Sequence, residues 1–346
     1  MGLSFRLLIE WCSLAARATN RRFAATVLIL AAAAIVDPLA ASAQTCTITP
    51  ANGNYGVVDV LGGASVSTST TFTLSCTGTP SARIVACVEL SPGQTNSSGQ
   101  RRLASGAYRL VHEVYADAAH TIVWGSWNQS STAYGSGGQT EILTLGSNGS
   151  GSMTLTAYGA TATNQQATAG PGSYVWTMTT APSIEYGYYS GTSCPTGTIQ
   201  AISGGSSWSA TVNSNCNVSV SSINFGSTGS IISSAIDTTG TINVQCTDGS
   251  PFSVGLDNGQ HANSGQRRMQ ALAGQYVSYG LYTDSAYSLA WTTSTSTTSC
   301  SGGTGTCALG TGTGSSQPIT IYAQIPPQNA PAPGSYADTV VVTVTF

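Results

Sequence analysis

The clearest alternation of apolar and polar positions lies at the end of the chain, after the turn Pro333-Gly334. Apolar side chains recur there at every second position, and they are Val340, Val342, Val344 and Phe346. A period of two in β-branched residues predicts a strand with one face in a core. Because the chain stops with this strand, we expect its outer edge to lie open to another chain unless an earlier strand returns to it.

Other alternating stretches predict strands earlier in the chain. They are Tyr55–Val60, Thr70–Cys76 and Arg83–Leu90, followed by two β-capable pieces at Thr198–Ile202 and Trp208–Val212. Beyond residue 43 no stretch has the period of an amphipathic helix, and 40 glycines leave few helix formers. The sequence therefore predicts an all-β protein.

One part of the chain repeats another. The run Ser-Gly-Gln-Arg-Arg occurs at 98–102 and again at 264–268, and each copy leads into an alternating strand. The matching residues that follow are 167 positions apart, and they are Tyr115 with Tyr282, Asp117 with Asp284, and Trp124 with Trp291. We interpret each copy as a hairpin, whose aspartate caps the turn and whose return strand brings the tryptophan inward.

The repeat predicts two tandem β domains, which we place at residues 44–210 and 211–346. The first has an additional stretch, Ala181–Ala210, that the second lacks. We expect this stretch to supply a strand that closes the first domain. The Gly- and Ser-rich run Ser203–Ser207 is either the flexible point between the domains or a loop of the first.

Residues 1–43 have the features of a secretory signal peptide. Arginines precede an apolar run at Phe23–Val36, and Ala41-Ser42-Ala43 is a small-residue cleavage site. The apolar run is too short to span a bilayer comfortably, so we expect export and no membrane span in the mature chain. We predict that the mature protein begins at Gln44.

Eight of the nine cysteines follow the expected leader, four in each half of the mature chain. An even number in an exported chain predicts disulfides, and the absence of any Cys-x-x-Cys argues against a metal site. Cys46 and Cys76 are 30 residues apart, as are Cys216 and Cys246, so we expect two equivalent bridges. Elimination leaves two further pairs, which are Cys87 with Cys194 and Cys300 with Cys307.

Charged residues make up only 7% of the chain, and none of them is lysine. The sequence therefore has no basic patch for nucleic acid or for an anionic membrane surface. The run Gly-Thr-Gly-Thr-Gly at 310–314 lacks the strand-to-helix setting of a nucleotide site, and we interpret it as a loop. We expect no cofactor.

His112 and Glu113 are the first candidates for catalysis, but neighbours on a strand face opposite sides of the sheet. We interpret them as a surface pair. Neither Gly-x-Ser-x-Gly nor His-Glu-x-x-His occurs in the sequence. These observations favour a protein that is not an enzyme, with an exported hydrolase as a remote alternative.

The repeat and the final strand together resemble the spore coat protein U domain. The residues concerned are Tyr279–Asp284 in the pattern Tyr-x-Leu-Tyr-x-Asp, then Trp291, and Gly334–Val344 with Tyr336 and Asp338. The first domain resembles the family more loosely, with Trp176 where the terminal pattern has aspartate. That family is similar to the subunits of archaic chaperone–usher pili.

The resemblance implies a fold and a set of partners. The fold is an immunoglobulin-like, pilin-like β-sandwich, and its second copy lacks the last strand and takes it from another molecule. The partners are a periplasmic chaperone, an outer-membrane usher and a pilin subunit that donates the strand. Their contact edge would be the strand that contains Val340, Val342, Val344 and Phe346.

Only Gln44 and Thr45 separate the expected cleavage site from Cys46, so we expect the chain to accept a strand but to have none to give. The resemblance then implies the tip subunit of a pilus at the cell surface. Its first domain would attach to an abiotic or host surface and support biofilm formation. A structural protein of a spore or cyst coat is the alternative that the family name favours.

Aromatic residues of the first domain are candidates for contact with a surface, and they are Trp127, Tyr134, Tyr186, Tyr188 and Tyr189. The apolar loops considered are Val57–Leu61, Ile122–Trp127 and Tyr186–Tyr189. We expect about half of these loop residues, Trp124 above all, to belong to the core instead. Flat aromatic faces with a polar rim bind sugars and hydrophobic solids alike, so the ligand stays open.

Overall fold

The computed structural model describes residues 44–49, 52–90, 99–125, 138–178, 183–188, 206–272, 274–329 and 332–346, with the backbone alone in 183–188. All regular elements in these ranges are strands, as the all-β prediction requires. The predicted signal peptide, residues 1–43, lies outside the described residues. Among the described residues, no helix has the length and apolar character needed to cross a membrane.

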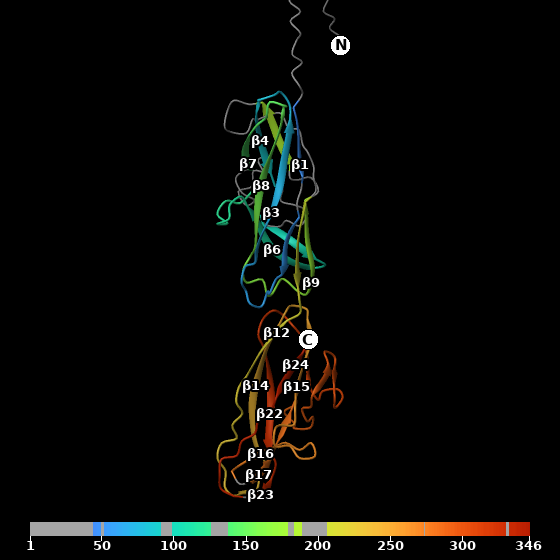
Figure 1. Cartoon of the computed structure of the whole chain (residues 1–346). Helices are drawn as coiled ribbons and strands as arrows, with labels where there is room; N and C mark the ends of the chain where they lie inside the picture. The colour runs from blue at the N-terminus through green and yellow to red at the C-terminus, as the bar shows by residue number, and fades with distance from the viewer. Residues whose placement is uncertain are drawn as a thin grey trace, which may run out of the picture. The chain divides into compact units, whose positions relative to one another are not determined.

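The first domain consists of two mostly antiparallel β-sheets (Figure 1). The larger sheet has the order β1-β3-β8-β6-β5-β9-β11-β2, and the smaller has the order β10-β4-β7. The strands of the larger sheet are β1 (Thr45–Thr49), β2 (Gly53–Val57), β3 (Ser67–Thr77), β5 (Arg101–Ser105), β6 (Tyr108–Tyr115), β8 (Ser150–Thr161), β9 (Gly172–Met178) and β11 (Ser206–Val212). Those of the smaller sheet are β4 (Arg83–Glu89), β7 (Gln139–Thr144) and β10 (Ser183–Tyr188).

The core of the first domain lies between these two sheets. Phe72 and Leu74 of β3 are fully buried, and so are Ile84 and Val88 of β4. They belong to one apolar cluster, to which alternate residues of each strand contribute. The domain is therefore a β-sandwich.

The second domain repeats the sandwich with shorter strands (Figure 1). One sheet has the order β12-β14-β22-β18, with strands β12 (Cys216–Val220), β14 (Ile236–Cys246), β22 (Gln317–Ile325) and β18 (Gly280–Tyr282). The other has the order β21-β15-β24, with strands β21 (Ala308–Thr311), β15 (Pro251–Leu256) and β24 (Val342–Thr345). Three short pairs complete it, and they are β13 (Ile231–Ile232) with β23 (Gln328–Asn329), β16 (Arg268–Gln270) with β17 (Tyr276–Ser278), and β19 (Ser294–Ser296) with β20 (Ser299–Cys300).

The core of the second domain likewise lies between its two sheets. Ile242 and Val244 of β14 and Ile321 of β22 face Phe252 and Val254 of β15 in one buried cluster. In the larger sheet of the first domain, the last strand along the chain is β11, which ends at Val212. The first strand of the second domain, β12, begins at Cys216. We therefore place the proposed domain boundary at residues 213–215, slightly beyond the position expected from the sequence.

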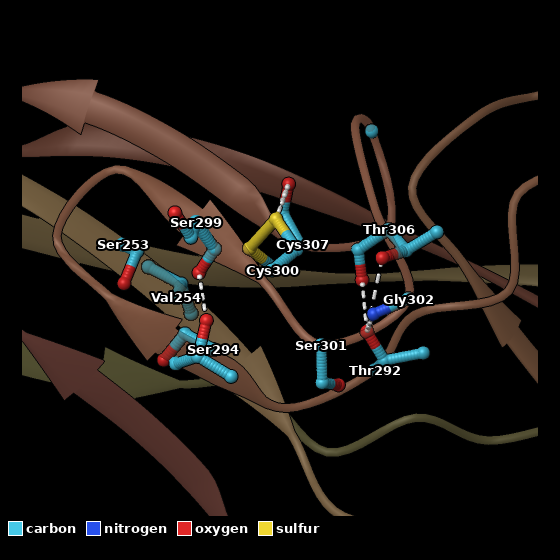
Figure 2. The surroundings of a disulfide bond; sticks show 12 residues. Ser253, Val254, Thr292, Ser294, Ser299, Cys300, Ser301, Gly302, Thr306 and Cys307 are labelled. Carbon is cyan, nitrogen blue, oxygen red and sulfur yellow. Dashed lines mark hydrogen bonds between the residues drawn. A yellow bond between two sulfur atoms is a disulfide. The ribbon is translucent and has the colours of Figure 1, made fainter.

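Disulfides fix corresponding strands in the two domains. Cys46 is bonded to Cys76, and Cys216 to Cys246, and each pair joins directly opposed residues of neighbouring strands. A third bridge joins Cys300 to Cys307 beside the hydrogen bonds between Thr292 and Thr306 (Figure 2). These are the pairs that we predicted. Cys87 is also disulfide-bonded, while Cys194 lies outside the described residues.

Candidate functional site

Both copies of the repeat form the same hairpin around a half-buried aspartate. Asp284 accepts hydrogen bonds from the amides of Ser288 and Leu289, at 3.1 and 2.7 Å. The bond from Leu289 contributes most to lowering the pKa of this carboxyl. The first domain repeats the arrangement with Asp117, Thr121 and Ile122. The predicted capping role of both aspartates is therefore confirmed.

A buried arginine and a buried tryptophan join each hairpin to the facing sheet. In the second domain, Arg267 Nη2 donates to the carbonyl oxygens of Trp291 and Leu256, at 2.7 and 3.3 Å. The indole Nε1 of Trp291 donates to the carbonyl oxygen of Val254 at 3.0 Å. The corresponding residues of the first domain are Arg101, Trp124, Leu90 and Val88. We call this arrangement the Arg–Trp clamp, and it marks equivalent points in the two domains.

The two domains differ at the edge beyond the clamp. In the first domain β11 lies between β9 and β2, antiparallel to β9 and parallel to β2. Its residues Ser206, Trp208, Ala210 and Val212 are all buried, and the residues between them are half-buried. The expectation that the stretch after residue 181 supplies a closing strand is thus confirmed for β11.

The corresponding edge of the second domain carries no such strand among the described residues. The segment 222–229, the counterpart of β2, forms no ladder, and residues 334–340, the counterpart of β9, form only an isolated bridge from Ala337 to Gln270. Between them lies a groove of about 370 Å³, whose apolar lining includes Ile223, Phe225 and Val340. A second hollow of about 650 Å³ continues it past Phe225 toward Val277 and Ile325.

Equivalent core positions are therefore covered in one domain and open in the other. Ile48 of β1 is 6% exposed, whereas Val218, at the same place on β12, is 47% exposed. Tyr55 is 5% exposed, but its counterpart Phe225 is only half-buried. Val218 lies directly opposite the buried Val244, so both face the core side of the sheet. Among the described residues, these core-side positions are therefore more exposed in the second domain than in the first.

A polar pair lies at one end of this groove. The hydroxyl of Tyr279 donates to Oδ2 of Asp338 at 2.7 Å, and the amide of His261 donates to Oδ1 at 3.3 Å. Burial, followed by the bond to Asp338, raises the pKa of Tyr279. The predicted signature residue Asp338 thus lines the groove, beside Tyr336.

The first domain has an aromatic cluster at the equivalent place. His112 corresponds to Tyr279, and Trp176 corresponds to Asp338. The ring centroids of His112 and Trp176 are 4.9 Å apart. His112 is buried, and its Nδ1 lies 3.0 Å from the hydroxyl oxygen of Tyr55. The prediction of a surface pair for His112 and Glu113 was therefore wrong. Glu113 forms an ion pair with Arg101, and burial, followed by Arg101, lowers the pKa of His112.

Comparison with known proteins agrees with the repeat. The sequence model of the spore coat protein U domain matches residues 31–181 and 204–343. The chain belongs to the spore coat protein U domain family. This is a family of structural proteins rather than enzymes.

Protein U of Myxococcus xanthus is 33% identical to this chain over 116 residues. The match covers 31% of the chain and 59% of that relative. Among solved structures, the pre-assembly complex of chaperone CsuC with tip subunit CsuE, from archaic Csu pili of Acinetobacter baumannii, has a TM-score of 0.47 at 18% identity. It covers 87% of this chain and 100% of that chain. The CupB6 tip adhesin of Pseudomonas aeruginosa has a TM-score of 0.37 at 12% identity, covering 86% and 93%.

Two of the four residues predicted for the open edge lie in a strand of the second spore coat protein U domain. Val342 and Val344 lie in β24, and with Val340 they pack against the core from one side. Phe346 is 49% exposed. Of these residues Val340 and Val342 line the groove, while contact of the strand with a partner remains a prediction.

The surface-contact candidates are mostly beyond what the structure describes. Trp127, Tyr134 and Tyr189 lie outside the described residues, and Tyr186 and Tyr188 are placed on β10 by their backbone alone. In the other loops considered, Trp124, Val58, Val60 and Leu61 are buried, whereas Val57 and Ile122 are exposed. The division of these loops into core and surface is therefore as expected.

Sequence reasoning missed the role of the arginines and of the groove wall. Arg101 and Arg267 come from the repeated Ser-Gly-Gln-Arg-Arg run, so the signal was present. Ile223 precedes the triplet Asn224-Phe225-Gly226, which has the same Asn-aromatic-Gly pattern as Asn54-Tyr55-Gly56. Aligning those two triplets would have placed the groove wall before the structure did.

Proposed function

We propose that this protein is an exported structural and adhesive subunit that accepts a β-strand from another protein in the groove of its second domain. The observation that carries the proposal is β11. The first domain is closed by a strand at the edge where the second domain presents exposed apolar residues and two segments, 222–229 and 334–340, that form no ladder. An added strand would supply main-chain hydrogen bonds to residues 334–340 and cover the groove with alternate side chains.

The energy at stake is large. If about five apolar side chains stay in water, the loss is about 7–15 kcal/mol at the usual 1.5–3 kcal/mol each. A whole domain is stable by a similar amount, about 5–15 kcal/mol. The second domain therefore needs an occupant at every stage. A periplasmic chaperone would fill the groove before assembly at an outer-membrane usher, and a pilin subunit would fill it afterwards.

The asymmetry between the domains suits a terminal position in a pilus. Because the first domain is closed by β11, strand exchange joins the described part of the chain to a partner through the second domain alone. The first domain would then be free to attach the pilus to an abiotic or host surface and to support biofilm formation. Trp127, Tyr134 and the tyrosines at 186, 188 and 189 remain the proposed contacts.

The family description supports a second candidate, a structural protein of a spore or cyst coat. The same groove would then join subunits into an envelope. Neighbouring genes for a periplasmic chaperone and an outer-membrane usher would favour the pilus, and labelled protein located in a dormant-cell envelope would favour the coat. Either location presupposes export, which N-terminal sequencing of the mature protein checks at the predicted start, Gln44.

Separate expression of the two domains tests the proposal. We expect residues 44–212 to purify as a soluble monomer with a sharp unfolding transition. We expect residues 211–346 to aggregate or to associate with a chaperone, because the groove stays wet. Co-expression with a periplasmic pilus chaperone should restore a soluble one-to-one complex. A stable monomer of residues 211–346 with slow amide exchange at Asp338 and Val340 would overturn the proposal.

A further inference from the structure

The strand β11 shows what an occupant of this kind of groove looks like. Its largest inward side chain is Trp208, which is fully buried. The indole lies directly against two glycines, Gly53 of β2 and Gly159 of β8. A Cβ atom on either glycine would come within 2.2 Å of the ring. The tryptophan therefore fits only because both positions lack a side chain.

The position of Gly53 can be matched in the second domain. Asn54 and Asn224 each accept a hydrogen bond from the amide of the glycine two residues on, at 2.8 Å. Those glycines, Gly56 and Gly226, have φ values of 69° and 76°. The residue before the asparagine is Gly53 in the first domain and Ile223 in the second.

The position of Gly159 can be matched as well. In the first domain Val114 pairs with Gly159, and 167 residues later Leu281 pairs with Ala323. Ala323 therefore stands where the first domain has Gly159. Both glycines that make room for the tryptophan are replaced, by Ile223 and Ala323.

Ile223 is seated firmly in this place. A Cβ atom on Gly240 of β14 would come within 2.6 Å of Ile223 Cγ1, so the isoleucine side chain occupies the space above that glycine. Ile223 also lines the groove together with Leu281 and Ile321. The wall of the second domain is thus built around an aliphatic side chain at the point where the first domain holds an indole.

We propose that Ile223, supported by Ala323, selects the strand that enters the second domain, admitting an aliphatic side chain and excluding a tryptophan at that position. The inference rests on the proposed function and names a property of the partner strand. The strand runs antiparallel to residues 334–340, as β11 does to β9, and its selected residue lies opposite Asp338. Trp208 lies opposite Trp176, the counterpart of Asp338, in that register.

The selection has a consequence for copies of this chain. If β11 fitted both grooves, it could leave its own domain and enter the second domain of a neighbouring copy, which is a domain swap. Ile223 blocks that exchange because Trp208 would overlap the isoleucine side chain. The groove therefore stays available for a partner whose strand is aliphatic at this point.

The test uses the full mature chain with a strand attached after Phe346 through a flexible glycine–serine linker. One version carries a copy of β11, Ser-Ser-Trp-Ser-Ala-Thr-Val, and the other carries Val in place of the Trp. A linker without a strand is the control. The readout is hydrogen exchange at Asp338 and Val340, which lie opposite the third and the first residue of the attached copy in this register. The neighbouring carbonyls of Ala337 and Thr339 accept bonds from other parts of the domain, so the amides of Asp338 and Val340 point to the open edge.

We expect the Val copy to slow exchange at both amides at least about tenfold, and the Trp copy to leave it near the control. In the Ile223→Gly chain, the difference in protection between the Val copy and the Trp copy should become smaller or change sign. Because that change could weaken the domain, Ala323→Gly is made in parallel, and it widens the same space from β22.

Three outcomes contradict the inference, and they are distinguishable. Equal protection by both copies in the unchanged chain would show that Ile223 does not select, while strand acceptance would stand. A preference for Val that neither glycine variant alters would assign the selection to other residues. Protection by neither copy in any background would overturn this inference together with the proposed function.

Discussion

The hydroxyl of Tyr279 donates a hydrogen bond to the carboxylate of Asp338 over 2.7 Å at the end of the groove. Tyr279 precedes β18 in one sheet, while Asp338 precedes β24 in the other. The bond thus ties the two sheets together at this end of the groove. A hydrogen bond to a charged group contributes more to stability than a neutral one.

Replacing Tyr279 by Phe should lower the unfolding free energy of the second domain by about 1.5–3 kcal/mol, because the carboxylate loses its hydroxyl donor. Denaturant titration, followed by exchange of the β14 and β22 amides, measures the loss. Tyr282→Phe is the matched control, since the hydroxyl of Tyr282 has no hydrogen bond among the described residues. Equal losses in the two variants would contradict a specific role for the bond.

Two consecutive arginines should respond differently to the same change. Arg267→Lys should destabilise the second domain by about 2–4 kcal/mol, because one ammonium cannot satisfy the buried carbonyls of Leu256, Asp257 and Trp291. Arg268 lies over the ring of Tyr276 at 4.1 Å and is half-buried. Its replacement by Lys should cost less than about 1 kcal/mol. Thermal unfolding of both variants compares them directly, and a larger cost at Arg268 would refute the clamp.

The first domain should lose stability in mild acid through His112. Burial lowers the pKa of this imidazole, so the unfolded chain binds a proton near pH 6.5 while the folded chain does not. The unfolding free energy of the first domain should therefore fall by about 1.4 kcal/mol for each pH unit below about 6.5, and it should be restored as the pH rises.

The substitution His112→Gln should remove this slope, and His261→Gln, in the second domain, should leave it. Unfolding between pH 6.5 and pH 5 is the relevant measurement, above the range where most carboxylates titrate. An unchanged slope in the His112 variant would assign the acid sensitivity to other groups.

The sequence predicted the elements better than their partners. The alternation at Trp208–Val212 identified a strand, but nothing local states that it pairs with β2, because register between distant strands depends on the packed core. His112 was placed on the surface because adjacent strand residues face opposite sides, which gives no indication of which side is buried. In the structure His112 is on the buried side and its ring packs against Trp176, while Glu113 forms an ion pair with the buried Arg101.

The groove was harder to predict than the edge. The period of two at Val340, Val342 and Val344 predicted a strand with one apolar face. The facing wall begins at Ile223, in a segment of serine, asparagine and glycine with no periodic pattern. Its role follows only from its place opposite Gly53 in the other copy, a relationship of tertiary structure.

The parallel pairing of β11 with β2 also fixes an order of events as the chain is made. Trp208 meets Gly53, so the contact closes a loop of 155 residues. Contacts between such distant residues form late, because a long loop must close first. A growing chain that ends before residue 206 has every other strand of the larger sheet but cannot complete it. During synthesis the first domain therefore also has an open edge, and this edge is covered only once β11 has been made.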